Sequence, residues 1–471
     1  MRPDMHEPRP SAPAADGPVS TAPHATEKSA RKAGIAGAAG NLIEFYDFSL
    51  YGLLAVVISP TFFPNENQAV STLIALGAFG TSYVARPFGG IFFGRLGDRY
   101  GRRPVLMTTV ISMGLAAGAI GLLPGYDSIG IAAPVLLILL RLVQGFSAGG
   151  ELAGATTYVV ESSPQGRRSF FAAVVGSGGS LGFVVAAVAS GIVGGVLTEE
   201  QFSDWGWRLL FLLCVPLAVL CLLVRSRLDE SPAFEAAQRR EKVTTSPVRA
   251  MLRHSWPALL RVIGIQIGCG AAAYMGLVYL SVYLVGTRGF AAADVYWIAA
   301  LAIGVQVIAL PFFGALGGRI GRRKLLFAAT ATLFVLAYPF FVLLSATESL
   351  VVVTLLCCAY LLVQGMQVSV SVTEFTLLFP VEYRYTGSAL GYNVATAVAG
   401  GFSPFIAAQL ILWTGSDLAP AYWLMAVSAI SLAVLATLGS FGPDRPSSVD
   451  YPDRPSGADN PGRPTILEPP S

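Results

Sequence analysis

The sequence predicts an all-α membrane protein with twelve transmembrane helices in two pseudo-symmetric six-helix halves. Of its 471 residues, 54% are hydrophobic and only 13% are charged, and the mean hydropathy is +0.62. Such a composition is far more apolar than that of a soluble globular chain. Twelve apolar stretches are each long enough to cross about 30 Å of hydrocarbon. Two motifs also recur at one fixed spacing, which indicates an internal duplication.

The first repeated motif reads G-R-L-G-D-R-Y-G-R-R at residues 94–103, and a weaker copy reads G-A-L-G-G-R-I-G-R-R at residues 314–323. The second motif, L-V-Q-G, stands at 142–145 and again at 362–365. Both pairs are offset by 220 residues, which is nearly half the chain. Because the sequence between the motifs is apolar, the duplicated unit is a bundle of membrane helices.

The chain is predicted to divide into five parts. Residues 1–33 are rich in Pro, Ala and Ser and form a disordered tail without a secretory signal. The two six-helix halves cover 34–225 and 258–442, a polar linker covers 226–257, and 443–471 form a Pro-rich disordered tail. The predicted spans are 34–59, 70–93, 104–124, 131–160, 169–197, 207–224, 258–286, 294–315, 325–346, 349–379, 386–413 and 419–441.

The distribution of arginine and lysine predicts the orientation. These residues gather in the short loops after even-numbered spans, whereas the odd-numbered loops offer little beyond Arg208 and Arg288. Basic loops are retained in the cytoplasm. Both termini are therefore predicted to be cytoplasmic, in a multi-pass protein of the plasma membrane.

Cysteine and histidine give no sign of a metal site or a cofactor. The five cysteines lie in apolar runs without metal-ligand spacing, and the three histidines lie outside the apolar runs. Proton chemistry inside the membrane must therefore use carboxylates. We expect no enzyme activity and no nucleic acid binding, and we expect a monomer whose partners are a small-molecule substrate, a proton and membrane lipid.

Span 1 contains two acids within one helical turn. Glu44, Asp47 and Tyr51 are spaced i, i+3 and i+7, which places them on one face of a helix. Acids inside a membrane helix are costly and usually face a cavity in which they act. The alternative is a purely structural ion pair with an arginine of span 2 or span 4. The residues predicted to couple the proton are Glu44, Asp47 and Glu151.

Two arginines, Arg86 and Arg141, lie inside predicted spans, where a guanidinium needs partners. Either they neutralise the acids of the first half, or at least one of them clamps a substrate carboxylate. Gln144 lies one turn from Arg141, so both side chains can address one site.

The second half is poorer in charge, with Glu374 as its one acid deep in a span and several glutamines as uncharged hydrogen-bonding groups. We therefore expect coupling chemistry in the first half, and shape and polar contacts from the second. The residues predicted to bind substrate are Arg86, Arg141, Gln144, Tyr51, Gln364, Glu374 and Asn393.

Several of these segments carry a resemblance to one family. The motif at 94–103 resembles the loop signature of the major facilitator superfamily. The first span, A-R-P at 85–87, R-L-V-Q-G-F-S at 141–147, W-G-W-R at 205–208, D-E-S-P-A-F at 229–234 and Y-R-Y-T-G at 383–387 resemble its metabolite:proton symporters. That family includes permeases for α-ketoglutarate, citrate, shikimate and proline or betaine. The resemblance implies a central substrate site that opens alternately to either side.

In that superfamily the motif is thought to latch the cytoplasmic side in one state. The copy at 314–323 has Gly318 where the first has Asp98, so we expect a second latch that lacks its acid and is weakened. The predicted gating residues are Gly94, Gly97, Asp98, Arg99, Gly101, Arg102, Arg103, Arg319, Arg322 and Arg323.

The sequence thus predicts proton-coupled uptake of a small polar metabolite, with a carboxylate favoured. Three alternatives stay open at this point. They are symport of a zwitterion such as proline or betaine, proton-coupled export, and ligand binding by a transporter-like receptor without turnover.

Overall fold

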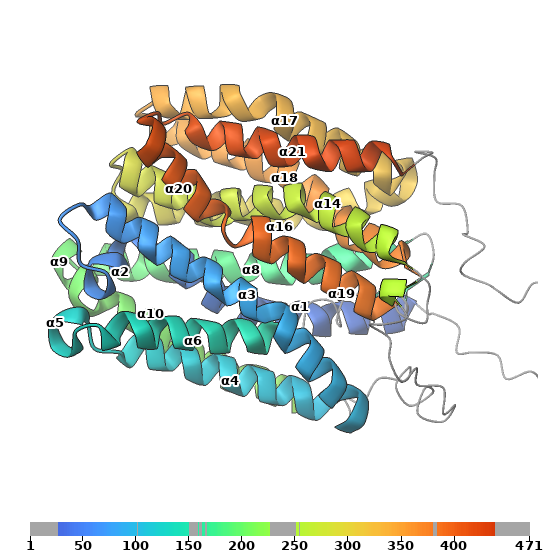
Figure 1. Ribbon diagram of the computed structural model, residues 1–471, viewed down its shortest axis with the longest axis horizontal. Coiled ribbons are helices and arrows are strands. Elements are labelled where there is room, and N and C mark those ends of the chain that lie inside the picture. The colour runs from blue at the N-terminus through green and yellow to red at the C-terminus, as the bar shows by residue number, and fades with distance from the viewer. Residues whose placement is uncertain are drawn as a thin grey trace, which may run out of the picture.

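The computed structural model describes residues 27–100, 102–149, 159, 163–164, 167–226, 251–253, 255–379 and 384–438. All regular structure in these ranges is helical. Helices suit the apolar sequence because they satisfy every backbone N–H and C=O within one segment, as a bilayer requires. Figure 1 shows the helices running roughly side by side, the blue-to-green first set beneath the yellow-to-red second set.

The first set begins with two helices that meet at a sharp bend and ends with a helix that contains a π-helical stretch. Its elements are α1 (Glu27–Leu53), α2 (Ala55–Phe62), α3 (Gln68–Tyr100), α4 (Arg102–Leu122), α5 (Tyr126–Ile129), α6 (Ala132–Ala148), α8 (Arg168–Val196), α9 (Glu199–Gln201), η2 (Phe202–Gly206), α10 (Trp207–Leu212) and α11 (Cys214–Ser226).

The second set is interrupted by π-helical stretches in two of its spans. Its elements are α14 (Trp256–Tyr274), η3 (Met275–Tyr279), α15 (Leu280–Val282), η4 (Tyr283–Thr287), α16 (Ala292–Ile320), α17 (Arg322–Ala346), α18 (Leu350–Leu377), α19 (Arg384–Ala395), η6 (Thr396–Gly400), α20 (Ser403–Thr414) and α21 (Ala419–Ala436).

Within the described ranges, nine helical segments are long and apolar enough to cross a membrane. The bent pair Gly37–Leu53 and Ala55–Phe62 makes a tenth if it is one span, and Met107–Leu122 and Ala132–Ala148 are shorter apolar helices. The multi-pass helical architecture is therefore confirmed. Twelve spans and cytoplasmic termini stay predictions.

Three features differ from the sequence prediction. The predicted tail extends to residue 33, but α1 already begins at Glu27. The predicted first span, 34–59, is not one straight helix, because α1 and α2 are bent by 69° at Leu54. The predicted fourth span, 131–160, matches α6 only as far as Ala148, and residues 150–158 lie outside the described ranges.

The repeated motif is helical and not an extended loop, which corrects the prediction for 94–103 and 314–323. In the first copy α3 continues to Tyr100 and α4 begins at Arg102. In the second, α16 continues to Ile320 and α17 begins at Arg322, so that a single residue makes the turn. That residue, Gly321, has φ +105°, a conformation that side-chain-bearing residues rarely adopt. We call this end of the bundle the motif end.

Glycines bring α3 and α6 into backbone contact. A Cβ atom at Gly145 would lie 2.9 Å from the Cα of Ser82, and one at Gly89 would lie 2.9 Å from the Cα of Phe146. Small residues permit such close helix packing in membranes. The consequence for the site is that Arg86 on α3 and Arg141 on α6 emerge from two helices held at minimal separation.

The two sets of helices contact each other on both sides of Arg86. Toward the motif end, the side-chain amide of Asn393 on α19 donates to the carbonyl of Gly149 at 2.9 Å. Away from it, the ring of Phe402 packs against Gly80, where a Cβ would lie 2.6 Å from the ring. An extensive contact between the sets is made by α8 and α16, which run together in the middle of Figure 1.

Candidate functional site

The acids predicted for span 1 are buried inside the bundle. Glu44 is 2% exposed and Asp47 is 3% exposed, and both belong to α1. Burying an ionised carboxylate is costly unless it is paired and hydrogen-bonded. The structure supplies cationic neighbours for this buried pair from α3 and α6.

Arg86 pairs with Glu44 and is surrounded by aromatic rings. Its Nη2 atom lies 3.3 Å from Oε1 of Glu44, and both side chains are 1% exposed. The guanidinium carbon lies 4.3 Å from the ring centroid of Phe48 and 4.5 Å from that of Tyr83. Cation–π contacts of this kind gain strength when the cation is desolvated. The structural alternative for Arg86, an ion pair with a span 1 acid, is therefore realised.

Arg141 reaches Asp47 through an intervening amide. Its Nη1 atom donates to Oε1 of Gln144 at 2.9 Å, and Nε2 of Gln144 donates to Oδ1 of Asp47 at 2.8 Å. The rings of Tyr51 and Phe48 lie 4.4 and 5.0 Å from the guanidinium carbon of Arg141. Four predicted site residues, Asp47, Tyr51, Arg141 and Gln144, thus meet at one point.

This cluster carries hydrogen-bonding capacity that its neighbours do not use. Among the described residues, Nε and Nη2 of Arg141, the hydroxyl of Tyr51 and Oδ2 of Asp47 have no hydrogen-bond partner. Buried polar groups are nearly always satisfied. Two guanidinium donors beside a phenol hydroxyl match the geometry of a carboxylate, which a planar fork binds in bidentate fashion.

Aromatic side chains that were not predicted as site residues surround the charged cluster. Phe48, Phe79 and Tyr83 come from the first set, and Tyr274 comes from α14 of the second. The ring centroids of Tyr83 and Tyr274 are 5.0 Å apart, so an edge-on aromatic pair joins the two sets beside Arg86. The signal available in the sequence was their spacing: Phe48 lies one turn after Glu44, and Tyr83 one turn before Arg86.

The predicted polar residues of the second half are engaged with other groups. Gln364 accepts a hydrogen bond from Gln306, which also donates to the carbonyl of Leu361. Asn393 bonds the backbone of Gly149 across the interface between the two sets. Their prediction as substrate-binding residues is untested, but in this conformation both make structural contacts.

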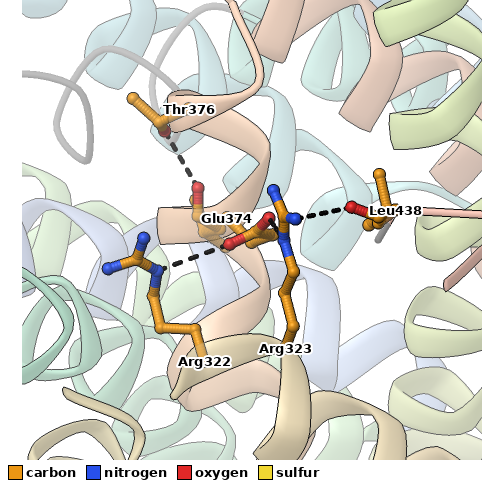
Figure 2. A network of polar contacts seen from close by, with 6 residues as sticks. Arg322, Arg323, Glu374, Thr376 and Leu438 are labelled. Atoms are coloured by element: carbon orange, nitrogen blue, oxygen red, sulfur yellow. Dashed lines mark hydrogen bonds and ion pairs between the residues drawn. The ribbon is translucent and has the colours of Figure 1, made fainter. Parts of the chain in front are cut away.

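Glu374 has two arginines as partners, both at the start of α17. Nε of Arg323 donates to its Oε1 atom at 2.6 Å, and Nε of Arg322 to its Oε2 atom at 3.4 Å. Figure 2 shows the two guanidinium groups on either side of the carboxylate, with Arg323 also donating to the carbonyl of Leu438 after α21. Glu374 therefore contacts two of the predicted gating residues in this conformation, and its role in substrate binding stays a prediction.

The same contacts correct the expectation of a second latch without an acid. The loop position itself holds Gly318, but α18 supplies the missing carboxylate from another helix. Sequence comparison of the two copies could not find this partner, because Glu374 lies 51 residues from Arg323 in the chain.

The first copy of the motif is described only in its backbone. Gly94, Gly97, Asp98 and Arg99 lie in the last turns of α3, and Arg102 and Arg103 open α4. Gly101 and Glu151 fall outside the described residues. Arg319 lies in the last turn of α16, next to the turn at Gly321.

Within the described ranges, no group of three or more His, Cys, Asp or Glu side chains is arranged to hold a metal ion.

The helical bundle with buried charges at its centre corresponds to a known protein family. Residues 38–404 match the sequence pattern of the Major Facilitator Superfamily. The chain belongs to that superfamily. It is thus a multi-pass transporter of the plasma membrane and not an enzyme, and the resemblance inferred from its motifs is confirmed.

Superfamily members with assigned substrates align over most of this transporter. The Escherichia coli K12 proline/betaine transporter is 35% identical over 419 residues, which cover 87% of this chain and 83% of that protein. The shikimate transporter of the same organism is 36% identical over 407 residues, covering 85% and 93%. The Corynebacterium glutamicum ectoine/proline transporter is 36% identical over 406 residues, covering 83% and 80%.

Solved structures of the superfamily share the fold of this transporter. A partially occluded, inward-open structure of the Escherichia coli xylose transporter XylE superposes with a TM-score of 0.69 at 13% sequence identity. The match covers 87% of this chain and 97% of that one. At this low identity the likeness concerns the fold alone.

Proposed function

We propose that this transporter is a proton-coupled symporter that takes up a small polar metabolite bearing a carboxylate group. The observation that carries the proposal is the set of unused donors on Arg141, which lie beside an acid, Asp47, that is able to hold a proton. Shikimate, proline and betaine, the substrates in the names of the relatives, all carry a carboxylate.

Charge balance supports coupling between proton and substrate. Arg86 and Arg141 contribute two positive charges, which Glu44 and Asp47 balance when both acids are ionised. A carboxylate that enters this buried cluster would leave an unbalanced negative charge, and buried net charge is costly. Protonation of one acid removes that charge. Substrate and proton therefore favour each other's binding, which is the thermodynamic requirement for symport.

A zwitterion is the second candidate, because the cluster also offers aromatic rings. Phe48, Tyr51, Phe79 and Tyr83 already hold two guanidinium groups, and the same faces attract the quaternary or secondary ammonium of a zwitterion. The two candidates differ in the charge that crosses the membrane. One proton with a monoanion moves no net charge, whereas one proton with a neutral zwitterion moves one.

Uptake of radiolabelled shikimate and proline into proteoliposomes tests the proposal. A proton gradient is imposed with and without an opposing membrane potential. Accumulation of either compound above its external concentration, abolished by a protonophore, is the expected result. A potential that is positive inside should slow proline uptake and leave shikimate uptake unchanged. Binding without accumulation would favour a receptor. Accumulation that occurs only when protons flow out of the vesicles would favour a proton-coupled exporter.

A further inference from the structure

A single amide, that of Gln144, stands between an acid and an arginine in the middle of the bundle. Gln144 and Arg141 are fully buried, and Asp47 is 3% exposed. The amide oxygen accepts from Nη1 of Arg141 at 2.9 Å, while the amide nitrogen donates to Oδ1 of Asp47 at 2.8 Å. Arg141 and Gln144 lie one turn apart on α6, and Asp47 faces them from α1.

The chemistry of the two neighbours fixes the orientation of this amide. A guanidinium has donors only, and an ionised carboxylate has acceptors only. Gln144 must therefore present its oxygen to Arg141 and its nitrogen to Asp47. Both hydrogen bonds have one charged partner, which makes them stronger than neutral ones, and bonds in series polarise each other. A proton on Asp47 removes the negative charge that the Gln144 nitrogen faces, and it thereby also weakens the hydrogen bond between the Gln144 oxygen and Arg141.

We propose that Gln144 is a positioning residue that links the proton on Asp47 to the release of Arg141 for substrate. This inference rests on the proposed symport function. While Asp47 is ionised, the amide oxygen occupies Nη1 of Arg141. When Asp47 is protonated, the hydrogen bonds of the amide weaken, and Nη1 is added to the unused Nε and Nη2 donors, so that all the donors of the guanidinium can turn to the substrate carboxylate. By linkage, a carboxylate that displaces the amide raises the affinity of the site for the proton.

Other charged and titratable groups also lie around Asp47, and of the described residues only Gln144 is hydrogen-bonded to both Asp47 and Arg141. On α4 and α8, the only charged side chains are arginines in the first turn, and Arg208 of α10 bonds the carbonyls of Gly121 and Leu123. The groups near Asp47 and Arg141 are Tyr46 and Tyr51 of α1, Tyr83 and Arg86 of α3 and Cys214 of α11, and those near the Arg86–Glu44 pair are Tyr274 of α14 and Tyr392 of α19.

The internal repeat provides an uncharged counterpart of the link. Gln364 stands 220 residues after Gln144, and the positions equivalent to Asp47 and Arg141 are Ile267 and Leu361. In the second half the equivalent amide accepts from Gln306, another neutral amide. The duplication therefore kept the buried amide, and only the copy between charged partners can sense a proton.

Replacing Gln144 by methionine tests the link, because methionine has a similar size and cannot bridge the two groups. Binding of shikimate and proline to the purified full-length protein is measured from acidic to alkaline pH. Affinity of the unaltered protein should fall as pH rises, by roughly 5- to 150-fold if the coupling has the usual strength. In Gln144→Met the pH dependence should weaken to the part that charge balance alone supplies, and gradient-driven accumulation should fall at least about tenfold while counterflow continues.

Gln367→Met is the matched control, since it removes a buried amide of α18 whose nitrogen donates to the hydroxyl of Thr330 at 2.9 Å. Its pH dependence should equal that of the unaltered protein. If Gln144→Met cannot be purified in folded form, Gln144→Asn takes its place, because the shorter amide cannot span both bonds and should weaken the pH dependence in the same way.

The outcomes separate this inference from the proposed function. If the unaltered protein accumulates neither compound under a proton gradient, the symport proposal is wrong and the link falls with it. If the unaltered protein does so and Gln144→Met keeps the same pH dependence of affinity, symport stands and the link is overturned. Equal losses of accumulation and counterflow, with the pH dependence intact, would assign Gln144 a merely structural role.

Discussion

Nε of Arg323 donates to Oε1 of Glu374 at 2.6 Å and so ties the start of α17 to α18 at the motif end. Arg322 contacts the other carboxylate oxygen at a longer 3.4 Å, and Glu374 is 3% exposed. The second copy of the motif therefore holds three elements together, since Arg323 also bonds the backbone after α21.

We predict that Glu374→Gln loosens this end of the second half. Replacing the carboxylate by a neutral amide removes charge-assisted hydrogen bonds, each worth about 1.5–3 kcal/mol. Cysteines placed near the motif end should become more accessible to a membrane-impermeant thiol reagent. Arg323→Gln should have a larger effect than Arg322→Gln, in line with the two distances. Unchanged labelling in all three variants would mean that the contacts of Glu374 with Arg322 and Arg323 do not hold this end closed.

The architecture and the first-half cluster were largely predictable, because strong local signals determine them. Apolar runs of sufficient length defined the spans, and the i, i+3 spacing of Glu44 and Asp47 placed both acids on one face. The internal repeat at 220 residues indicated two related halves.

What the sequence did not predict depends on contacts between distant segments. Glu374 was predicted to bind substrate because it is the one acid deep in a span of the second half, and no signal near it in the sequence marked it as the partner of Arg322 and Arg323. The motif was expected to be a loop because the predicted spans end before it and begin after it, yet in the second copy only Gly321 turns the chain. Gly314 instead permits close packing, since a Cβ there would lie 2.6 Å from the carbonyl oxygen of Ser169 on α8.

We predict that Asp47 and Glu44 differ in their roles. Asp47→Asn should abolish gradient-driven accumulation and spare counterflow, because the amide cannot release a proton and Gln144 can still be hydrogen-bonded. Glu44→Gln leaves the buried guanidinium of Arg86 without its ion pair, and losing one partner of a buried pair costs about 3–5 kcal/mol. That variant should unfold at a lower temperature. Normal accumulation by both variants would exclude these acids from proton coupling.

A glycine pair on α3 provides a matched test of the contact between the two sets of helices. Gly80→Ala should destabilise the contact between the two sets, because its Cβ would lie 2.6 Å from the ring of Phe402. Overpacking of this kind costs about 1–3 kcal/mol. Gly77→Ala is the control, since its Cβ would lie at an ordinary 3.5 Å from the ring of Phe405. Thermal unfolding and thiol accessibility on the side away from the motif end should change in the first variant only. If the two variants behave alike, the packing of Gly80 against Phe402 does not stabilise the contact between the two sets.

The final prediction concerns Arg141 and separates a substrate clamp from a structural brace. Arg141→Lys keeps the positive charge but removes the planar fork and the stacking on Tyr51, which lies 4.4 Å from the guanidinium carbon. If Arg141 holds a carboxylate, affinity for shikimate or proline should fall by about 1.5–3 kcal/mol, which is roughly 10- to 150-fold. If Arg141 only braces α6 against α1, the unfolding temperature should fall while monodisperse protein keeps its affinity.

Arg86→Lys serves as the comparison for Arg141→Lys. Arg86 already has a carboxylate partner in Glu44, so a lysine there should lower thermal stability more than affinity. Dissociation constants measured by calorimetry on both purified variants decide the matter. Unaltered affinity in Arg141→Lys would remove the arginine clamp, because the unused Nε and Nη2 donors on which it rests would then have no role in binding.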